Sequence, residues 1–330
     1  MALILGIETT AHTFGVGIVT DKGAILANAK HSFTTSHGGM IPAEVGEHHF
    51  QVWQDVLDDA LRKAAVKLKE IDVFAFSRGP GLGNSLRVGA FVARCLALKN
   101  KKPLIGVNHC IAHLSIGALR SKAKNPVLLY ASGANTQVIA LETGKYRIFG
   151  ETLDQGVGNF IDIVARELGL GFPGGPLLEK LALQGNTLIE LPYVVKGMDV
   201  SFGGLFTNVK QKIASKRFRK EDIAFSVQET VFAMLVEIAE RALAHMGKKE
   251  LVLGGGVACN MRLQEMCRIM CQERGARMFC PEKEFLVDNG AMIAWQGWLE
   301  FNAGKKDVVS ESIILPYWRT DDVAADWLLT

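Results

Sequence analysis

Short apolar runs alternate with amphipathic segments through the first third of this 330-residue chain. Residues 3–8 and 71–77 are almost continuously apolar, which is typical of buried strands. Apolar residues at helical spacing over 42–69 and 85–99 predict two helices. Further strands are predicted at residues 14–19, 24–29 and 104–107. This alternation indicates an α/β fold.

The rest of the chain repeats the pattern, with helices predicted over residues 160–168, 226–246, 259–273 and 288–301 and a strand over 250–253. When Thr13 is set against Thr136, the polar turn at 9–13 aligns with a second polar turn at 132–136. An apolar strand precedes each turn and another follows it. The repeat predicts two duplicated α/β domains that share a cleft. We place the first domain at 1–120 and the second at 121–291, and we expect a returning C-terminal helix within 292–330 to join the first.

Composition narrows the class of protein. A hydrophobic content of 48% and a charged content of 22% favour a folded core over disorder. The net charge of +3 does not by itself indicate nucleic-acid binding, so an RNA contact must rest on a local patch. The six cysteines show no disulfide framework, and no apolar run approaches the roughly 20 residues of a membrane span. We expect a soluble, cytoplasmic protein without a membrane partner.

Two histidines stand four residues apart in the segment 108–113. If this segment is helical, the imidazoles of His109 and His113 project from one face toward a common point. Tyr130 and Asp288 could complete a four-residue metal site with them. Histidines at this spacing are also common on helices that bind no metal, so the pair alone does not establish a metal site.

Glycine-rich turns precede several predicted helices. The turns at 79–83 and 254–256 suit phosphate groups, because free N–H groups and the helix dipole point at an anion. Tight turns also need glycine for backbone reasons. Asp162 and Glu179 flank the turn at 172–176, where carboxylates can accept ribose hydroxyls; a solvated helix face is the alternative for each. A metal beside a nucleotide cradle suggests group transfer at a carbonyl or phosphoryl centre.

A basic segment covers residues 210–220 and holds no acidic residue. It is a candidate RNA contact, because phosphates bind Lys and Arg. A solubilising helix end is the alternative, since charge runs usually are solvated. Its basic residues are Lys210, Lys212, Lys216, Arg217, Arg219 and Lys220.

Seven motifs occur in order along the chain: Glu-Thr-Thr-Ala-His-Thr (8–13), Gly-Pro-Gly-Leu-Gly (79–83), Asn-His-Cys-Ile-Ala-His (108–113), Ser-Gly-Ala-Asn-Thr-Gln (132–137), Gly-Phe-Pro-Gly-Gly-Pro (171–176), Gly-Gly-Gly-Val-Ala-Cys-Asn (254–260) and Asp-Asn-Gly-Ala-Met (288–292). Together they resemble the universal tRNA threonylcarbamoyladenosine synthases, in the archaeal and eukaryotic form that is the catalytic subunit of the KEOPS complex. The resemblance covers nearly the whole chain.

The resemblance implies the fold of the actin, hexokinase and heat-shock-chaperone ATPases, with two duplicated α/β domains around a ligand cleft. It implies transfer of threonylcarbamoyl from threonylcarbamoyl-AMP to the exocyclic amine of the adenosine 3′ of the anticodon. The implied partners are tRNA, a small dimerising subunit, and a small protein kinase or ATPase subunit that in some archaea is fused at the C-terminus. It leaves the catalytic general base unassigned.

By match to the motifs, one metal ion per chain would be bound by His109, His113, Tyr130 and Asp288. Hard oxygen ligands favour Fe²⁺, with Zn²⁺ as the alternative. The implied substrate-binding residues are Tyr130, Ala131, Ser132, Gly133 and Ala134 beside the phosphate, Asp162, Gly175 and Glu179 near the ribose, and Asn260 near the adenine. The family usually has glycine where this chain has Ala134, so a positive φ there would be strained.

Two other functions are weighed against this one. A kinase-like ATPase of the same fold would bind Mg²⁺, which prefers oxygen and water to two histidines. A metallopeptidase needs a glutamate next to the first histidine, and here Cys110 stands there. The apolar tail at 308–330 is expected either to pack on the first domain or to lead to a kinase domain.

Overall fold

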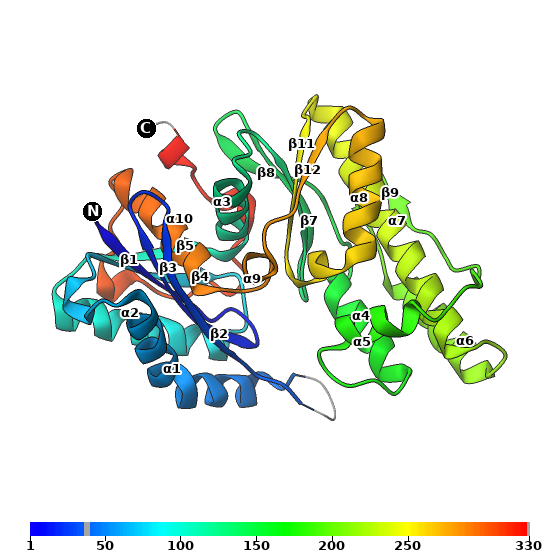
Figure 1. Ribbon diagram of the computed structural model, residues 1–330, viewed down its shortest axis with the longest axis horizontal. Helices are drawn as coiled ribbons and strands as arrows, with labels where there is room; N and C mark the ends of the chain where they lie inside the picture. Colours follow the sequence, from blue (N-terminus) through cyan, green and yellow to red (C-terminus); the bar gives the residue numbers. More distant parts are fainter. Residues whose placement is uncertain (36–39, 329–330) are drawn as a thin grey trace.

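The computed structural model describes residues 1–35 and 40–328, and its strands form two five-stranded sheets and one two-stranded ribbon. Figure 1 shows the two larger sheets side by side, each covered by its own helices. The strand order is β3-β2-β1-β4-β5 in one sheet and β8-β7-β6-β11-β12 in the other. In both sheets three antiparallel strands continue into two parallel strands. The predicted duplication of an α/β unit is confirmed.

The first sheet is covered by helices on both faces. Helices α1 (Pro42–Ala64) and α2 (Gly83–Asn100) pack on one face, and α3 (His109–Ser121) and α10 (Gly290–Asn302) share the other. Because both faces are covered, four of its strands are mostly buried and apolar, whereas the edge strand β3 is partly exposed and carries polar side chains. The five strands are β1 (Leu3–Glu8), β2 (Thr13–Thr20), β3 (Ile25–Ser32), β4 (Val73–Gly79) and β5 (Leu104–Asn108).

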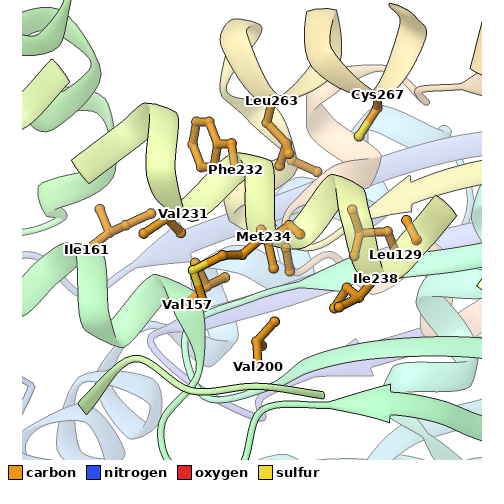
Figure 2. Close-up of a cluster of buried hydrophobic side chains, with 14 of the residues drawn as sticks. Leu129, Val157, Ile161, Val200, Val231, Phe232, Met234, Ile238, Leu263 and Cys267 are labelled. Carbon is orange, nitrogen blue, oxygen red and sulfur yellow. The ribbon is translucent and has the colours of Figure 1, made fainter. Parts of the chain in front are cut away.

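The second sheet packs on the long helix α7 (Lys220–Met246). Figure 2 shows Val231, Met234 and Ile238 of this helix in contact with the cluster that includes Leu129 and Val157. Its strands are β6 (Val127–Ala131), β7 (Thr136–Glu142), β8 (Lys145–Glu151), β11 (Glu250–Gly254) and β12 (Arg277–Phe279), and the ribbon is β9 (Val195–Lys196) with β10 (Asp199–Val200). The other helices of this unit are α4 (Val157–Glu167), α5 (Gly174–Ala182), α6 (Gly203–Ser215) and α8 (Met261–Glu273), with the short α9 (Lys283–Leu286) before α10.

Helix α10 lies directly on the backbone of the first sheet. Gly6 and Gly17 pair across β1 and β2. A Cβ added to Gly6 would lie 2.2 Å from the nitrogen of Ala294, and one added to Gly17 would lie 2.1 Å from the nitrogen of Ala291. Glycine is therefore required here by the close approach of two backbones. The contact fixes the start of α10, and with it the residue Asp288.

One predicted helix ends earlier in the structure than in the sequence pattern, and the last predicted helix ends where the pattern places it. Helix α1 stops at Ala64, because Ala65 adopts a left-handed conformation with φ 54°. The helix predicted over residues 288–301 is α10, which ends at Asn302, and Gly304 has φ +93° just beyond it. Past that point, residues 303–328 run as irregular chain with short 3-10 turns. No helix in the described part of the chain is long and apolar enough to cross a membrane.

The C-terminal segment contacts both units rather than the first alone. Asp307 pairs with Leu104 of β5, and Ala324 pairs with Lys145 of β8. The ring of Trp327 lies 6.2 Å from that of Tyr146. The packing expected for the tail is therefore found, but it extends to the second unit.

Candidate functional site

Helix α3 begins at the end of β5, where the two units meet (Figure 1). The side chain of Asn108 caps this helix by accepting hydrogen bonds from the backbone N–H groups of Cys110 and Ile111. The helix therefore starts at His109, and its first two turns carry both histidines of the sequence motif. The side chains of His109 and His113 are buried, with ring centroids 4.8 Å apart.

Four predicted metal ligands converge on one point. The Nε2 atom of His109 lies 2.9 Å from the hydroxyl of Tyr130, at the end of β6. Asp288 Oδ1 lies 3.3 Å from His113 Nε2 and 3.5 Å from His109 Nε2. The donor atoms of both histidines and Asp288 lie within 4.8 Å of one another. We call these four residues the His–Tyr–Asp cluster.

Glu8 supports this cluster and was not among the predicted site residues. Its Oε2 atom accepts a hydrogen bond of 2.9 Å from His109 Nδ1, so we assign the proton of the imidazole to that nitrogen. Nε2 of His109 is then left with its lone pair toward Tyr130 and Asp288. The other oxygen of Glu8 accepts from the backbone N–H and hydroxyl of Thr10. The sequence did contain a signal for this role, because a charged residue at the end of an apolar, buried strand needs a polar partner.

The surroundings of the cluster favour an anionic Asp288. Burial opposes ionisation of this carboxyl, but the hydrogen bond from His113 and the two imidazoles hold its pKa well below its usual value. Burial lowers the pKa of His113, whereas Glu8 outweighs burial at His109 and raises its pKa. Burial raises the pKa of Tyr130 well above its usual value. The buried Nδ1 of His113 has no hydrogen-bond partner among the described residues.

The loop at 130–134 is held tightly by neighbouring backbone. Ser132 closes the turn, with its hydroxyl donating to the carbonyl of Asn135 at 3.0 Å. A Cβ on Gly156 would lie 2.4 Å from the Gly133 carbonyl oxygen, and one on Gly255 would lie 2.3 Å from that of Ala131. Positive φ among the described non-glycine residues occurs at Ala65, Lys101, Lys122, Thr143 and Lys216, so Ala134 does not carry the strain considered from the sequence.

Asp162 lies on α4 and Glu179 on α5, and the side chain of each reaches the start of another helix. Asp162 Oδ1 accepts from the backbone N–H of Gly174 at 2.7 Å, at the start of α5. Glu179 Oε1 accepts from that of Met261 at 2.8 Å, at the start of α8. Anionic side chains are stabilised there by the helix dipole. Burial raises the pKa of Asp162 despite that bond. Helix α5 therefore connects the two carboxylates of the predicted nucleotide site, because its start bonds Asp162 and its own Glu179 bonds the start of α8.

Asn260 and Gly175 are placed at the same two helix starts. Asn260 caps α8 through its Oδ1, and its Nδ2 donates to Gln228 Oε1 at 2.9 Å. Gly175 is the second residue of α5, and a Cβ added there would meet nothing within 4 Å. Asn260 thus keeps a single amide N–H for a ligand, while Gly175 borders open space.

The basic segment covers the second half of α6, the connection to α7 and the first residue of α7, at the outer end of the second unit and away from the junction of the two units (Figure 1). Several of its charges already have protein contacts. Lys220 donates to the carbonyl of Leu168 at 2.9 Å, and the ammonium of Lys212 lies 5.1 Å from the ring centroid of Phe218. Lys210 lies 3.6 Å from Glu167. Lys216 and Arg217 are exposed.

Residues 24–295 match the family of tRNA N6-adenosine threonylcarbamoyltransferases. The protein of that name from Thermococcus kodakarensis is 53% identical over 325 residues, which is 98% of this chain and 99% of that protein. The mouse protein of the same name is 48% identical over 334 residues, which is 99% of each.

Solved structures at lower identity share the fold. HypF from T. kodakarensis has a TM-score of 0.65 at 17% identity, over 95% of this chain and 49% of HypF. Component A of (R)-2-hydroxyglutaryl-CoA dehydratase from Acidaminococcus fermentans has a TM-score of 0.57 at 14% identity, over 90% of this chain and 98% of that one. Because the full-length relatives are about half identical and the family match spans most of the sequence, the chain belongs to the tRNA N6-adenosine threonylcarbamoyltransferase family.

Proposed function

We propose that this transferase moves threonylcarbamoyl from threonylcarbamoyl-AMP to the exocyclic amine of the adenosine 3′ of the anticodon, at a metal ion held by the His–Tyr–Asp cluster. The observation that carries the proposal is the convergence of two imidazoles, a phenol and a carboxylate from three separate segments. The names of the relatives supply the reaction class, and the convergence of the cluster residues supports a reaction at this site.

The donor set fits a divalent ion. His109 is oriented by Glu8, as metal-binding histidines are commonly oriented by a carboxylate. Asp288 supplies a negative charge in a site from which water is largely excluded, where a cation compensates for the cost of burial. Two nitrogen and two oxygen donors suit Fe²⁺, with Zn²⁺ as the alternative.

The chemistry needs positioning more than a nucleophile. A mixed anhydride of a carbamoyl group and a phosphate is already activated, so a covalent intermediate is unnecessary. A bound divalent ion would act as a Lewis acid and hold the threonyl carboxylate. The chain itself holds the loop at 130–134 rigid through Gly156 and Gly255, and it shields the reacting groups with the buried side chains of β6 and α3.

Nucleotide binding is expected to depend on Glu179. One carboxylate oxygen bonds Met261, so the other remains free to accept a ribose hydroxyl. Glu179→Ala is expected to weaken binding of AMP by about 1–3 kcal/mol, measured by calorimetry, because a hydrogen bond to a charged group is lost. Glu190→Ala, on an exposed loop, is the control. Unchanged affinity in Glu179→Ala would remove this residue from the site.

We propose that the basic segment binds tRNA. Replacing Lys216, Arg217 and Arg219 together with Gln is expected to weaken tRNA binding and to reduce its salt dependence, because each lost phosphate contact reduces the slope of log K against log salt by about 0.7–0.9. The matched control replaces Lys67, Lys69 and Lys99 of the first unit with Gln. An unchanged slope in the first variant would favour the solubilising role.

We infer that partner proteins complete the enzyme. A relative from Methanothermobacter thermautotrophicus, named as a probable bifunctional tRNA threonylcarbamoyladenosine biosynthesis protein, is 49% identical over 99% of this chain, which covers 61% of that protein. A fused partner domain therefore occurs in some family members. We propose a kinase or ATPase partner for this chain, and a dimerising subunit on the exposed apolar side chains of α1 and α2, among them Phe50, Phe91 and Leu98.

Analysis of the product nucleoside tests the proposed reaction. The chain is mixed with the partner subunits, tRNA and preformed threonylcarbamoyl-AMP, and the digested tRNA is examined for threonylcarbamoyladenosine. Product is expected with tRNA that carries adenosine 3′ of the anticodon and not with tRNA that carries guanosine there. Hydrolysis of the adenylate without modified tRNA would contradict the proposal.

A further inference from the structure

A row of directly paired residues crosses the first sheet beside the His–Tyr–Asp cluster. Gly15 of β2 pairs with Glu8 of β1 on one side and with Lys30 of β3 on the other. Directly paired residues of antiparallel strands point to the same face of a sheet. Because Glu8 contacts His109, Lys30 projects from the face that carries the cluster.

The start of α10 fills the space above Gly15. A Cβ added to Gly15 would lie 3.1 Å from the nitrogen of Gly290 and 3.6 Å from the Cα of Asn289. Asp288 immediately precedes these residues. Lys30 and Glu8 thus flank the segment that carries Asp288, one from each neighbouring strand.

Other contacts show how far side chains on this face of β3 reach. Asn28, two residues before Lys30 and on the same face, donates to Glu284 Oε2 of α9 at 3.3 Å. Helix α9 in turn packs against the turn at 256–259. Cys259 belongs to the second unit and ends the turn that starts with the glycines at 254–256. Lys30 therefore extends from the first unit toward the glycine turn of the second.

The Lys30 ammonium makes no ion pair within 4.0 Å with any residue in 1–35 or 40–328. Lys283, on α9, adds a second positive charge near the turn at 256–259. Two lysines near a glycine turn combine cationic charge with backbone N–H groups, which is an arrangement suited to a phosphate.

We propose that Lys30 is a positioning residue that binds the phosphate of the acyl adenylate from across the cleft, opposite the glycine turn that begins at Gly254. This inference rests on the proposed function, since it takes the donor to be an adenylate. An ion pair from the first unit to a ligand held by the second would couple donor binding to the alignment of the two units, and so to the alignment of Tyr130, on β6, with the histidines.

Calorimetry with AMP and with adenosine tests the assignment. Lys30→Gln is expected to raise the Kd for AMP about tenfold, the effect of losing a charge-assisted hydrogen bond, and to leave the Kd for adenosine within about twofold. Lys30→Arg is expected to restore most of the AMP affinity. Lys22→Gln, in the turn at the opposite end of the same hairpin, is the matched control and should bind AMP as wild type does. The unfolding temperature should not change, because Lys30 is exposed.

The outcomes separate this inference from the proposed function. If the wild-type chain binds neither AMP nor adenosine, the nucleotide site fails and the role of Lys30 fails with it. If wild type binds AMP more tightly than adenosine and Lys30→Gln keeps that difference, only the assignment of Lys30 is overturned. Loss of tRNA affinity in Lys30→Gln with unchanged AMP affinity would overturn it as well, in favour of an RNA phosphate.

Discussion

A chain with His109→Ala and His113→Ala together is expected to transfer threonylcarbamoyl about a thousandfold more slowly than wild type. The double substitution removes two of the four donor groups of the cluster and leaves Asp288 without its partner at 3.3 Å. Charge stabilisation by a bound metal is worth several kcal/mol, and each 1.36 kcal/mol is a factor of ten in rate. The rate is measured in single turnover with preformed threonylcarbamoyl-AMP.

Two further variants control this experiment. His245→Ala removes an exposed histidine of α7 and should leave the rate unchanged. Asp288→Asn keeps the shape of the cluster while removing its charge, so it should slow transfer without the cavities that two alanines create. A folded double variant with the wild-type rate would show that the histidines take no part in transfer.

Gly17→Ala is expected to destabilise the protein by about 3 kcal/mol, because overpacking against rigid backbone forces main-chain movement. The added methyl would lie 2.1 Å from the nitrogen of Ala291, and no flexible side chain is available to move aside. Helix α10 must then shift away from the sheet and carry Asp288 with it. Urea unfolding measures the change in free energy, and transfer activity should fall in parallel.

Gly204→Ala is the matched control for this substitution. Gly204 lies in the first turn of α6, where an added Cβ meets nothing within 4 Å. Alanine is expected to be neutral there or to stabilise by about 0.4–1 kcal/mol, because it restricts the unfolded chain. Equal stabilities of Gly17→Ala and Gly204→Ala would mean that α10 does not depend on its contact with the sheet.

The pattern of apolar residues correctly predicted the strands that are buried along their whole length. The apolar run at 3–8 became β1, because a strand covered on both faces has no polar side. Strands β8 and β12 were missed. Both lie at sheet edges, where Lys145 and Arg277 are exposed and the apolar run is interrupted. The last helix was predicted over residues 288–301 and is found at Gly290–Asn302, with Gly304 in a positive-φ conformation just beyond its end.

The site was predictable in part. The helical spacing of His109 and His113 placed both rings on one face without knowledge of the fold. Spacing could not show that Glu8 orients His109, because that contact joins residues 101 positions apart through the pairing of β1, β4 and β5. Nor could it show that Asp162 and Glu179 bond helix starts, since those contacts depend on how α5 packs between its neighbours.

The measurement that tests the central claim most directly is the metal content of the purified chain. The claim is that His109, His113, Tyr130 and Asp288 hold one divalent ion at which transfer occurs. Elemental analysis is expected to find about one Fe or Zn per wild-type chain and none in the folded His109→Ala, His113→Ala variant. Full retention of the metal by that variant would contradict the claim, because the ion would then be bound elsewhere.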